Sequence, residues 1–96
     1  MYARVMTSTA KPNSIDQAVE DWPRHIGAFK GKGLIAGYLL VDRGTHQFLS
    51  ITIWESEDAQ KRNSTSPEQA KGRAEFMKHL VSAPVPSVFE VAATVL

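Results

Sequence analysis

The stretch QFLSITIWESEDAQKRNSTSPEQAKGRAEFMKHL, residues Gln47 to Leu80, decides the fold of this 96-residue chain. Its first part, Gln47 to Glu55, is rich in β-branched and aromatic residues and predicts a strand. Ser56 is a typical helix N-cap, and the residues after it are acidic first and basic later, as the helix dipole favours. This pattern predicts a short helix that ends at Asn63-Ser64-Thr65.

A second helix is predicted directly after that end. Ser66 is the expected N-cap, Pro67 stands at the first helical position, and Gln69 completes the spacing of a capping box. The apolar residues that follow are expected to form one face, with Phe76 and Leu80 on its flank; they are Ala70, Ala74, Met77 and Val81. Pro84 and Pro86 should end this helix, and Val88 to Leu96 reads as a final, valine-rich strand.

The residues on the N-terminal side of the stretch predict a hairpin. Leu34 to Val41 is almost continuously apolar, and Asp42-Arg43-Gly44-Thr45 has the composition of a tight turn. We therefore expect this strand to pair antiparallel with the strand that begins at Gln47.

The first third of the chain predicts one strand and one helix. Tyr2 to Thr9 has the composition of a strand, and Ser14 with Gln17 three residues later predicts a capped helix start. Apolar residues then recur at helical spacing as far as Phe29, and the helix should end near Gly31-Lys32-Gly33. Pro23 lies inside this pattern and is expected to kink the helix or split it in two, because it cannot donate to the carbonyl of Val19.

The order of elements is strand, helix, strand, strand, two helices, strand. This order is that of a ferredoxin-like α+β domain, with one four-stranded antiparallel sheet and helices on one face. The length fits a single domain over residues 1–96.

The other face of the sheet should need a partner. Apolar side chains occupy successive positions of the predicted strands, so they point to both faces. Five such side chains left in water would forfeit about 7 to 15 kcal/mol, which is comparable with the stability of a whole domain. We therefore expect a homodimer formed through the open sheet face.

Composition argues against several other classes of protein. The formal net charge is +1, with basic residues scattered along the chain, so neither nucleic acid nor a membrane surface is an expected partner. The chain has no cysteine, and its N-terminus lacks the apolar region of a signal peptide, so the cytoplasm is the expected compartment. The three histidines, His25, His46 and His79, lie far apart in the sequence and predict no metal site.

Several features resemble one known family. The chain resembles the antibiotic biosynthesis monooxygenase family in its order of elements and in its C-terminal valine strand. It is also similar in the junction Trp54-Glu55-Ser56 and in the segment Gly33-Leu34-Ile35-Ala36-Gly37 at the start of the second strand. That family belongs to the dimeric α+β barrel superfamily. The resemblance covers essentially the whole chain and implies a dimeric barrel of two sheets. It leaves function open, because the same scaffold carries cofactor-independent oxygenases, haem-degrading enzymes, isomerases and members without a known reaction.

The haem-degrading branch does not match this chain. The resemblance would require an asparagine on the first strand, and a tryptophan and a histidine on the helices after Trp54. The chain has Thr7, Asn63 and Arg73 at these positions. An arginine stays protonated and cannot serve as the axial ligand of haem.

A cofactor-independent oxygenase needs an apolar pocket, a base and a cation or donor to hold a phenolate-like anion. His25 is the candidate base, and Arg73 the candidate cation. The candidate substrate-binding residues are Trp22, Trp54, Asn63, Phe76 and Met77, of which the tryptophans could stack on an aromatic ligand. Each has a structural alternative: a satisfied histidine, a solvated arginine, core aromatic residues or a turn asparagine. The other hypothesis is therefore a non-catalytic dimeric binding or interaction module.

Overall fold

The computed structural model describes residues 1–96 and forms one sheet covered by helices. The elements in chain order are β1 (Tyr2–Thr9), α1 (Ile15–Gly27), β2 (Leu34–Asp42), β3 (Gln47–Trp54), α2 (Glu57–Ser64), α3 (Pro67–Phe76), a 3-10 turn (Met77–His79) and β4 (Val85–Glu90).

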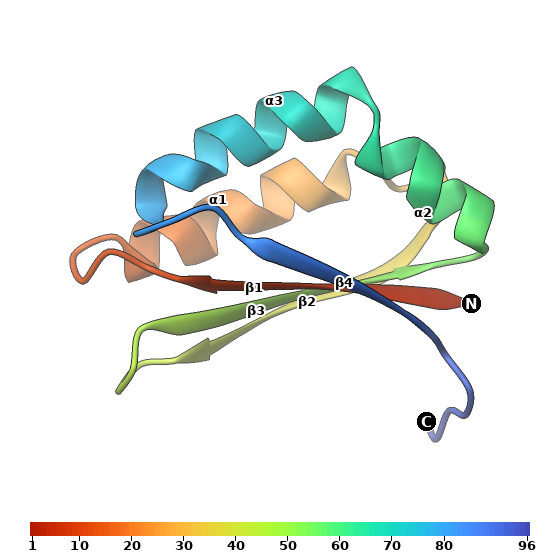
Figure 1. The fold of residues 1–96 in the computed structure, drawn as a ribbon, viewed down its shortest axis with the longest axis horizontal. Coiled ribbons are helices and arrows are strands. Elements are labelled where there is room, and N and C mark those ends of the chain that lie inside the picture. Colours follow the sequence, from red (N-terminus) through yellow and green to blue (C-terminus); the bar gives the residue numbers. More distant parts are fainter.

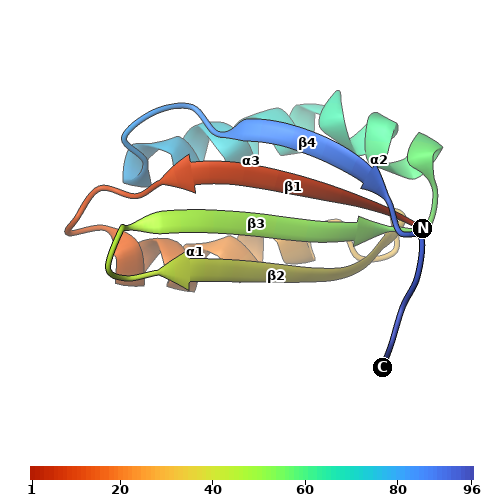
Figure 2. The same ribbon diagram turned by 60° about the horizontal axis from the view of Figure 1, so that its bottom comes forward.

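All helices lie on one face of the sheet (Figure 1), and the strands run in the order β2-β3-β1-β4 with every neighbouring pair antiparallel (Figure 2). The predicted α+β, ferredoxin-like architecture is confirmed. The hairpin between β2 and β3 is also confirmed, and the Asp42 carboxylate accepts hydrogen bonds from the backbone of Gly44 and Thr45 in its turn.

Two of the three predicted helix caps are confirmed. The Ser56 hydroxyl accepts from Ala59 N–H at 3.1 Å, and the Ser66 hydroxyl accepts from Gln69 N–H at 3.1 Å. Ser14 makes no such bond, so the capping box predicted there is wrong. The box at Ser66 is half formed, because the backbone N–H of Ser66 donates to the carbonyl of Asn63 instead of to the Gln69 side chain.

Helix α1 is not split at Pro23. It runs from Ile15 to Gly27 as one element (Figure 1). The residues that face the sheet on both sides of the proline are buried, namely Ile15, Ala18, Trp22 and Ile26. Packing of this apolar stripe offsets the one hydrogen bond that Pro23 cannot make.

The predicted core face of α3 is wrong. Ala70, Ala74, Met77 and Val81 are exposed, whereas Gln69 is buried, and Gly72 and Phe76 are half-buried. The helix also ends earlier, at Phe76, and continues only as the 3-10 turn. The error has a physical cause: the inward face of α3 is partly polar, so hydrophobic periodicity points to the wrong side.

The last strand begins earlier than predicted and ends at Glu90, while residues 91–96 form no regular structure. Pro86 lies within β4 and opposite Met6 of β1. A proline is tolerated there because β4 is an edge strand, so its missing N–H interrupts no second ladder.

The core lies between the sheet and the helices in two clusters. One contains Ala10, Ile15, Ala18, Phe48 and Leu80. The other contains Trp22, Ile26, Phe29, Trp54 and Ala59.

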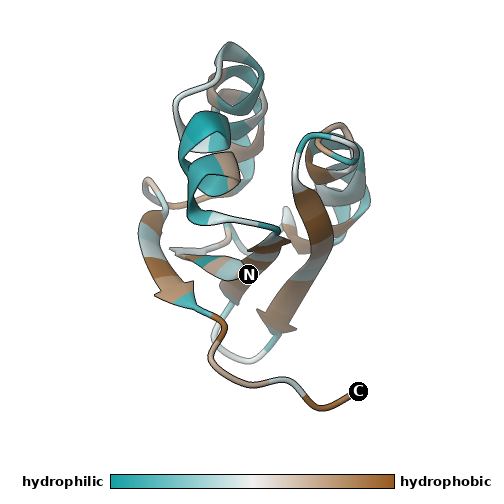
Figure 3. Ribbon diagram, turned by 90° about the vertical axis from the view of Figure 1, so that its right-hand side faces the viewer, coloured by the Kyte–Doolittle hydropathy of each residue, from teal (hydrophilic) through white to brown (hydrophobic).

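The opposite face of the sheet has no helix over it (Figure 2). Tyr38, Leu40, Val85 and Phe89 on this face are exposed by 47 to 64%. Between them, Val5, Leu49, Ile51 and Ile53 are only half-buried. The strands are therefore among the more hydrophobic parts of the ribbon although one of their faces is open (Figure 3). None of the helices is both long and apolar enough to cross a membrane.

Candidate functional site

Strand β1 places a charged residue under the helices. Side chains alternate along a strand, so Arg4, Met6 and Ser8 point to the helix-covered face. Arg4 is only 3% exposed, and its guanidinium carbon lies 5.1 Å from the ring centroid of Trp54. Its Nε and Nη1 atoms have no hydrogen-bond partner, and no carboxylate lies within ion-pair distance.

Burial, and to a lesser extent the nearby positive charge of Arg73, lower the pKa of Arg4 to about 10. The guanidinium is still protonated at neutral pH. An arginine held in this way is a buried cation that the chain itself does not neutralise.

Two adjoining cavities lie against Arg4. The inner cavity, about 40 Å³, is partly open and lies among β1, β3, α1, α3 and the segment after α3, and Trp22, His25, Ser50 and Phe76 are among its lining residues. The outer cavity, about 270 Å³, lies towards α2 and the edge strand β4 and includes Pro86 and Val88. Four residues line both cavities: Arg4, Met6, Gln69 and Arg73.

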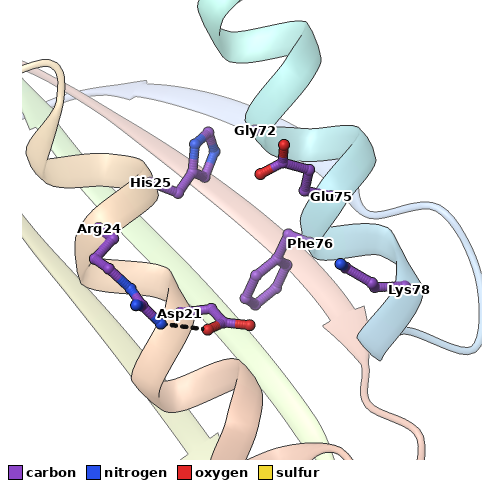
Figure 4. Close-up of a pocket in the computed structure, with 7 residues that line it drawn as sticks. All are labelled: Asp21, Arg24, His25, Gly72, Glu75, Phe76 and Lys78. Atoms are coloured by element: carbon purple, nitrogen blue, oxygen red, sulfur yellow. Dashed lines mark hydrogen bonds and ion pairs between the residues drawn. The ribbon is translucent and has the colours of Figure 1, made fainter.

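His25 projects from α1 towards α3 (Figure 4) and is half-buried. Its ring meets Phe29 edge-on at 5.6 Å between centroids, and it packs so closely on Gly72 that a Cβ at that position would overlap the imidazole. Burial lowers the pKa of His25 and the charge of Arg4 lowers it further, whereas Glu75 acts in the opposite direction. The imidazole is therefore neutral at neutral pH and able to accept a proton.

His25 also lines a third, polar cleft of about 390 Å³ between α1 and α3 (Figure 4). Asp21, Arg24, Glu75 and Lys78 border this cleft, and Arg24 pairs with Asp21 at 2.7 Å. The His25 side chain thus lies between the inner cavity and an open, charged surface.

His79 has a different environment from His25. Its Nε2 lies 2.9 Å from an Asp21 carboxylate oxygen, and its ring meets Phe76 edge-on. The hydrogen bond from His79 lowers the pKa of Asp21, and a second one from Gln17 adds to this. This pair joins the 3-10 turn that follows α3 to α1. No three histidine or carboxylate side chains are grouped closely enough to hold a metal ion.

The structure brings together four of the seven candidate residues. His25, Arg73, Trp22 and Phe76 line the inner cavity. The Trp22 indole also donates to the Ser50 hydroxyl at 3.0 Å, which fixes its ring.

The other three candidate residues lie elsewhere. Trp54 has no exposed surface, and its indole donates to Thr52 in the core. Met77 is 38% exposed on the outer side and lines none of the cavities described here. Asn63 lies in α2 and borders a separate cavity beside Phe29 and Gly33.

Sequence reasoning missed Arg4 and Gln69. Gln69 is 4% exposed, and its side-chain oxygen has no hydrogen-bond partner. A signal for Arg4 was present, because strict alternation along Tyr2–Thr9 puts a positive charge on the helix-covered face of a strand. A charged residue at such a position is rarely buried without a partner.

No family model and no curated protein matches the sequence, but many solved structures match its fold. A crystal structure of an antibiotic biosynthesis monooxygenase has a TM-score of 0.76 and 15% identity, over 97% of this chain and 100% of that one. Rv0793 from Mycobacterium tuberculosis has a TM-score of 0.77 and 14% identity, over 97% of this chain and 96% of that one. A conserved protein from Methanosarcina mazei Go1 has a TM-score of 0.78 and 11% identity, over 92% of this chain and 89% of that one. The resemblance is thereby confirmed for the fold.

Proposed function

We propose that this chain, on the fold it shares with antibiotic biosynthesis monooxygenases, is a cofactor-independent oxygenase acting on a small phenol- or quinol-like substrate. The observation that carries the proposal is that a neutral, half-buried His25 and the unneutralised cation of Arg4 line one small cavity. A base and a fixed positive charge are the two groups that stabilise formation of a phenolate.

The chemistry needs no other source of electrons. His25 removes the hydroxyl proton, and Arg4 and Arg73 stabilise the anion that forms. The electron-rich ring then reduces O2: one oxygen atom becomes a ring carbonyl and the other leaves as water. For a phenol, the products are a quinone and water, and all four electrons come from the substrate.

The position of His25 supplies a route for the proton. The imidazole lies between the inner cavity and the cleft of Asp21, Glu75 and Lys78. A proton taken from substrate on the inner side is able to pass to solvent on the cleft side, which regenerates the base.

We also propose that the working form is a homodimer in which two open sheet faces pack together. The support is the row of exposed apolar side chains on Tyr38, Leu40, Val85 and Phe89, flanked by half-buried neighbours on the two central strands. Monomeric proteins rarely expose a continuous apolar surface of this kind. A second copy offers a surface of the same shape and polarity, which is the isologous contact of a twofold dimer.

The direct test of the enzymatic proposal is oxygen consumption with a panel of phenols, naphthols and quinols under air. Wild-type protein should form quinone, with one atom of labelled O2 in the product and one in water. The His25→Gln variant should lose about 10²-fold or more in kcat, the range expected when a general base is removed. If no compound of the panel is oxidised faster than in buffer, the proposal fails.

A second candidate is a non-catalytic binding module on the same scaffold. The small size of the inner cavity favours it, because about 40 Å³ has no room for an aromatic ring. In that case ligands should bind at the outer cavity without any oxygen uptake, and His25→Gln should leave their affinity unchanged.

A further inference from the structure

The strongest unexplained feature of the site is its charge. Arg4 and Arg73 both line the two adjoining cavities, and the field of Arg73 is felt at Arg4. None of the residues that line either cavity is an aspartate or a glutamate. Two positive charges therefore meet at the junction of the cavities, and the chain provides no negative charge there to balance them.

A second polar group at the junction is also unpaired. The Gln69 side-chain oxygen is buried without a donor, as Nε and Nη1 of Arg4 are without acceptors. The Ser50 hydroxyl, in the inner cavity, accepts from Trp22. Buried polar groups are normally paired within the protein, so a cluster of unpaired ones marks a place built for a ligand with polar groups of its own.

The shapes of the cavities divide a ligand into two parts. The inner cavity, about 40 Å³, accepts a single hydroxyl-sized group next to His25. The outer cavity, about 270 Å³, has room for one aromatic ring against Met6, Pro86 and Val88. The two arginines lie where these parts meet.

Resting on the proposed function, we infer that the substrate is a hydroxylated aromatic carboxylate. The hydroxyl group enters the inner cavity and loses its proton to His25, which gives one negative charge. The carboxylate supplies the second charge at the arginine pair, with hydrogen bonds of the charge-assisted kind that guanidinium groups form best. Arg73 is itself exposed to solvent, so a ligand needs a second negative charge to hold it at the site, which an uncharged phenol lacks.

The test compares two quinols that differ only in the carboxylate, 2,5-dihydroxybenzoate and hydroquinone. Binding is measured without oxygen, through the fluorescence of the two tryptophans and through backbone NMR shifts. The carboxylate should tighten binding by about tenfold or more, the size expected from one charge-assisted interaction. Arg4→Gln and Arg73→Gln should each remove most of this preference.

Arg43→Gln is the matched control, because Arg43 is an exposed arginine that pairs with Asp16 and lines neither cavity. It should keep the full preference, and thermal melts confirm that each variant is folded. Equal binding of the two quinols, no binding of either at millimolar concentration, or a preference that survives both arginine substitutions would overturn the inference.

Admission of air to the bound samples separates this inference from the proposed function. Preference for the carboxylate without any oxygen uptake would uphold the ligand class and reject the oxygenase. Conversion of hydroquinone and 2,5-dihydroxybenzoate to hydroxyquinones with equal kcat/KM, with one atom of labelled O2 in the product and one in water, would uphold the oxygenase and reject the ligand class.

Discussion

Each face of the sheet departs in part from the usual arrangement. Beside the core residues Phe48 and Trp54, the covered face buries polar side chains, with Arg4 at 3% and Thr52 at 1% exposure. The open face exposes large apolar ones, with Tyr38 at 58% and Phe89 at 57%. In most antiparallel sheets with one covered face, apolar residues lie under the helices and polar residues face water.

Each face would therefore be completed by a partner of a particular kind. The open face lacks apolar surface, which a second copy of the chain is able to supply. The covered face lacks negative charge and hydrogen-bonding groups, which a small anionic ligand is able to supply. Substitutions that reverse the character of one face should therefore affect assembly in one case and ligand binding in the other.

The largest effect is expected from a charge on the open face. Ile51 lies in the central strand β3, between Val5 and Tyr38 on its neighbours. Ile51→Glu would bury an unpaired carboxylate in the proposed dimer, at a cost of about 3–5 kcal/mol. Sedimentation at micromolar concentration should show a dimer for the wild type and a monomer for the variant, with a lower melting temperature.

Ala74→Glu is the control for Ile51→Glu, because it adds the same charge to the exposed side of α3. Its melting temperature and sedimentation should match the wild type. A monomeric wild type, or two variants with the same small effect, would show that water covers the open face.

The second largest effect is expected from Arg4, whose replacement should raise stability and weaken ligand binding. Arg4→Met keeps a side chain of similar length and removes a buried charge without a partner. The free protein should become more stable by about 1–4 kcal/mol, as when other buried ionic groups are replaced by apolar ones. Urea denaturation measures this gain, while binding of 2,5-dihydroxybenzoate should be lost. A variant less stable than the wild type would mean that the contact of Arg4 with Trp54 is structural.

The sequence predicts the open face better than the covered face. Periodicity, turns and caps gave the strands, the hairpin at Asp42 and the helix starts at Ser56 and Ser66. An excess of apolar residues in the strands also predicts the exposed apolar side chains of the open face. These features depend on local pattern, which a single sequence contains.

The sequence predicts the candidate site only in part, because its residues come from four different elements. The chemistry of His25 and Arg73 marks them as candidates, and the fold places both at the inner cavity. Hydrophobic spacing on α3 puts Met77 on the apolar face, and this prediction is wrong because the inward face carries Gln69 and Gly72 instead. Which residues of different elements meet is decided by packing, and local pattern does not contain it.

The next effect on stability is expected at the contact between α1 and α3, at Gly72. A Cβ at this position would overlap the His25 ring, whereas a Cβ at Gly27, the last residue of α1, meets nothing within 4 Å. Gly27→Ala should therefore gain up to about 1 kcal/mol, the usual benefit of replacing glycine in a helix. Gly72→Ala should gain less or lose stability, and it should move the His25 ring from its buried place. Calorimetry compares the two variants, and an equal gain for both would show that the ring moves aside freely.

The smallest effect is expected in the pH dependence of stability. Burial and Arg4 lower the pKa of His25 from its ordinary 6.5, so the unfolded chain binds its proton more readily than the folded protein does. The contribution of His25 to the free energy of unfolding is complete above pH 6.5 and declines as the pH falls through this value. It declines no further once the pH is below the pKa of His25 in the folded protein. Glu75 on α3 opposes this shift, so the net effect is modest.

Urea denaturation of wild type and His25→Gln at about pH 7.5 and about pH 5.5 isolates this contribution, because every other titrating group is common to both proteins. The wild type should lose more stability between the two values than the variant does. Arg4→Met removes the second cause of the shift, so the pKa of His25 measured by NMR should rise in that protein. A pKa unchanged by Arg4→Met would mean that burial alone keeps His25 neutral, and that the cation at the covered face does not act on the proposed base.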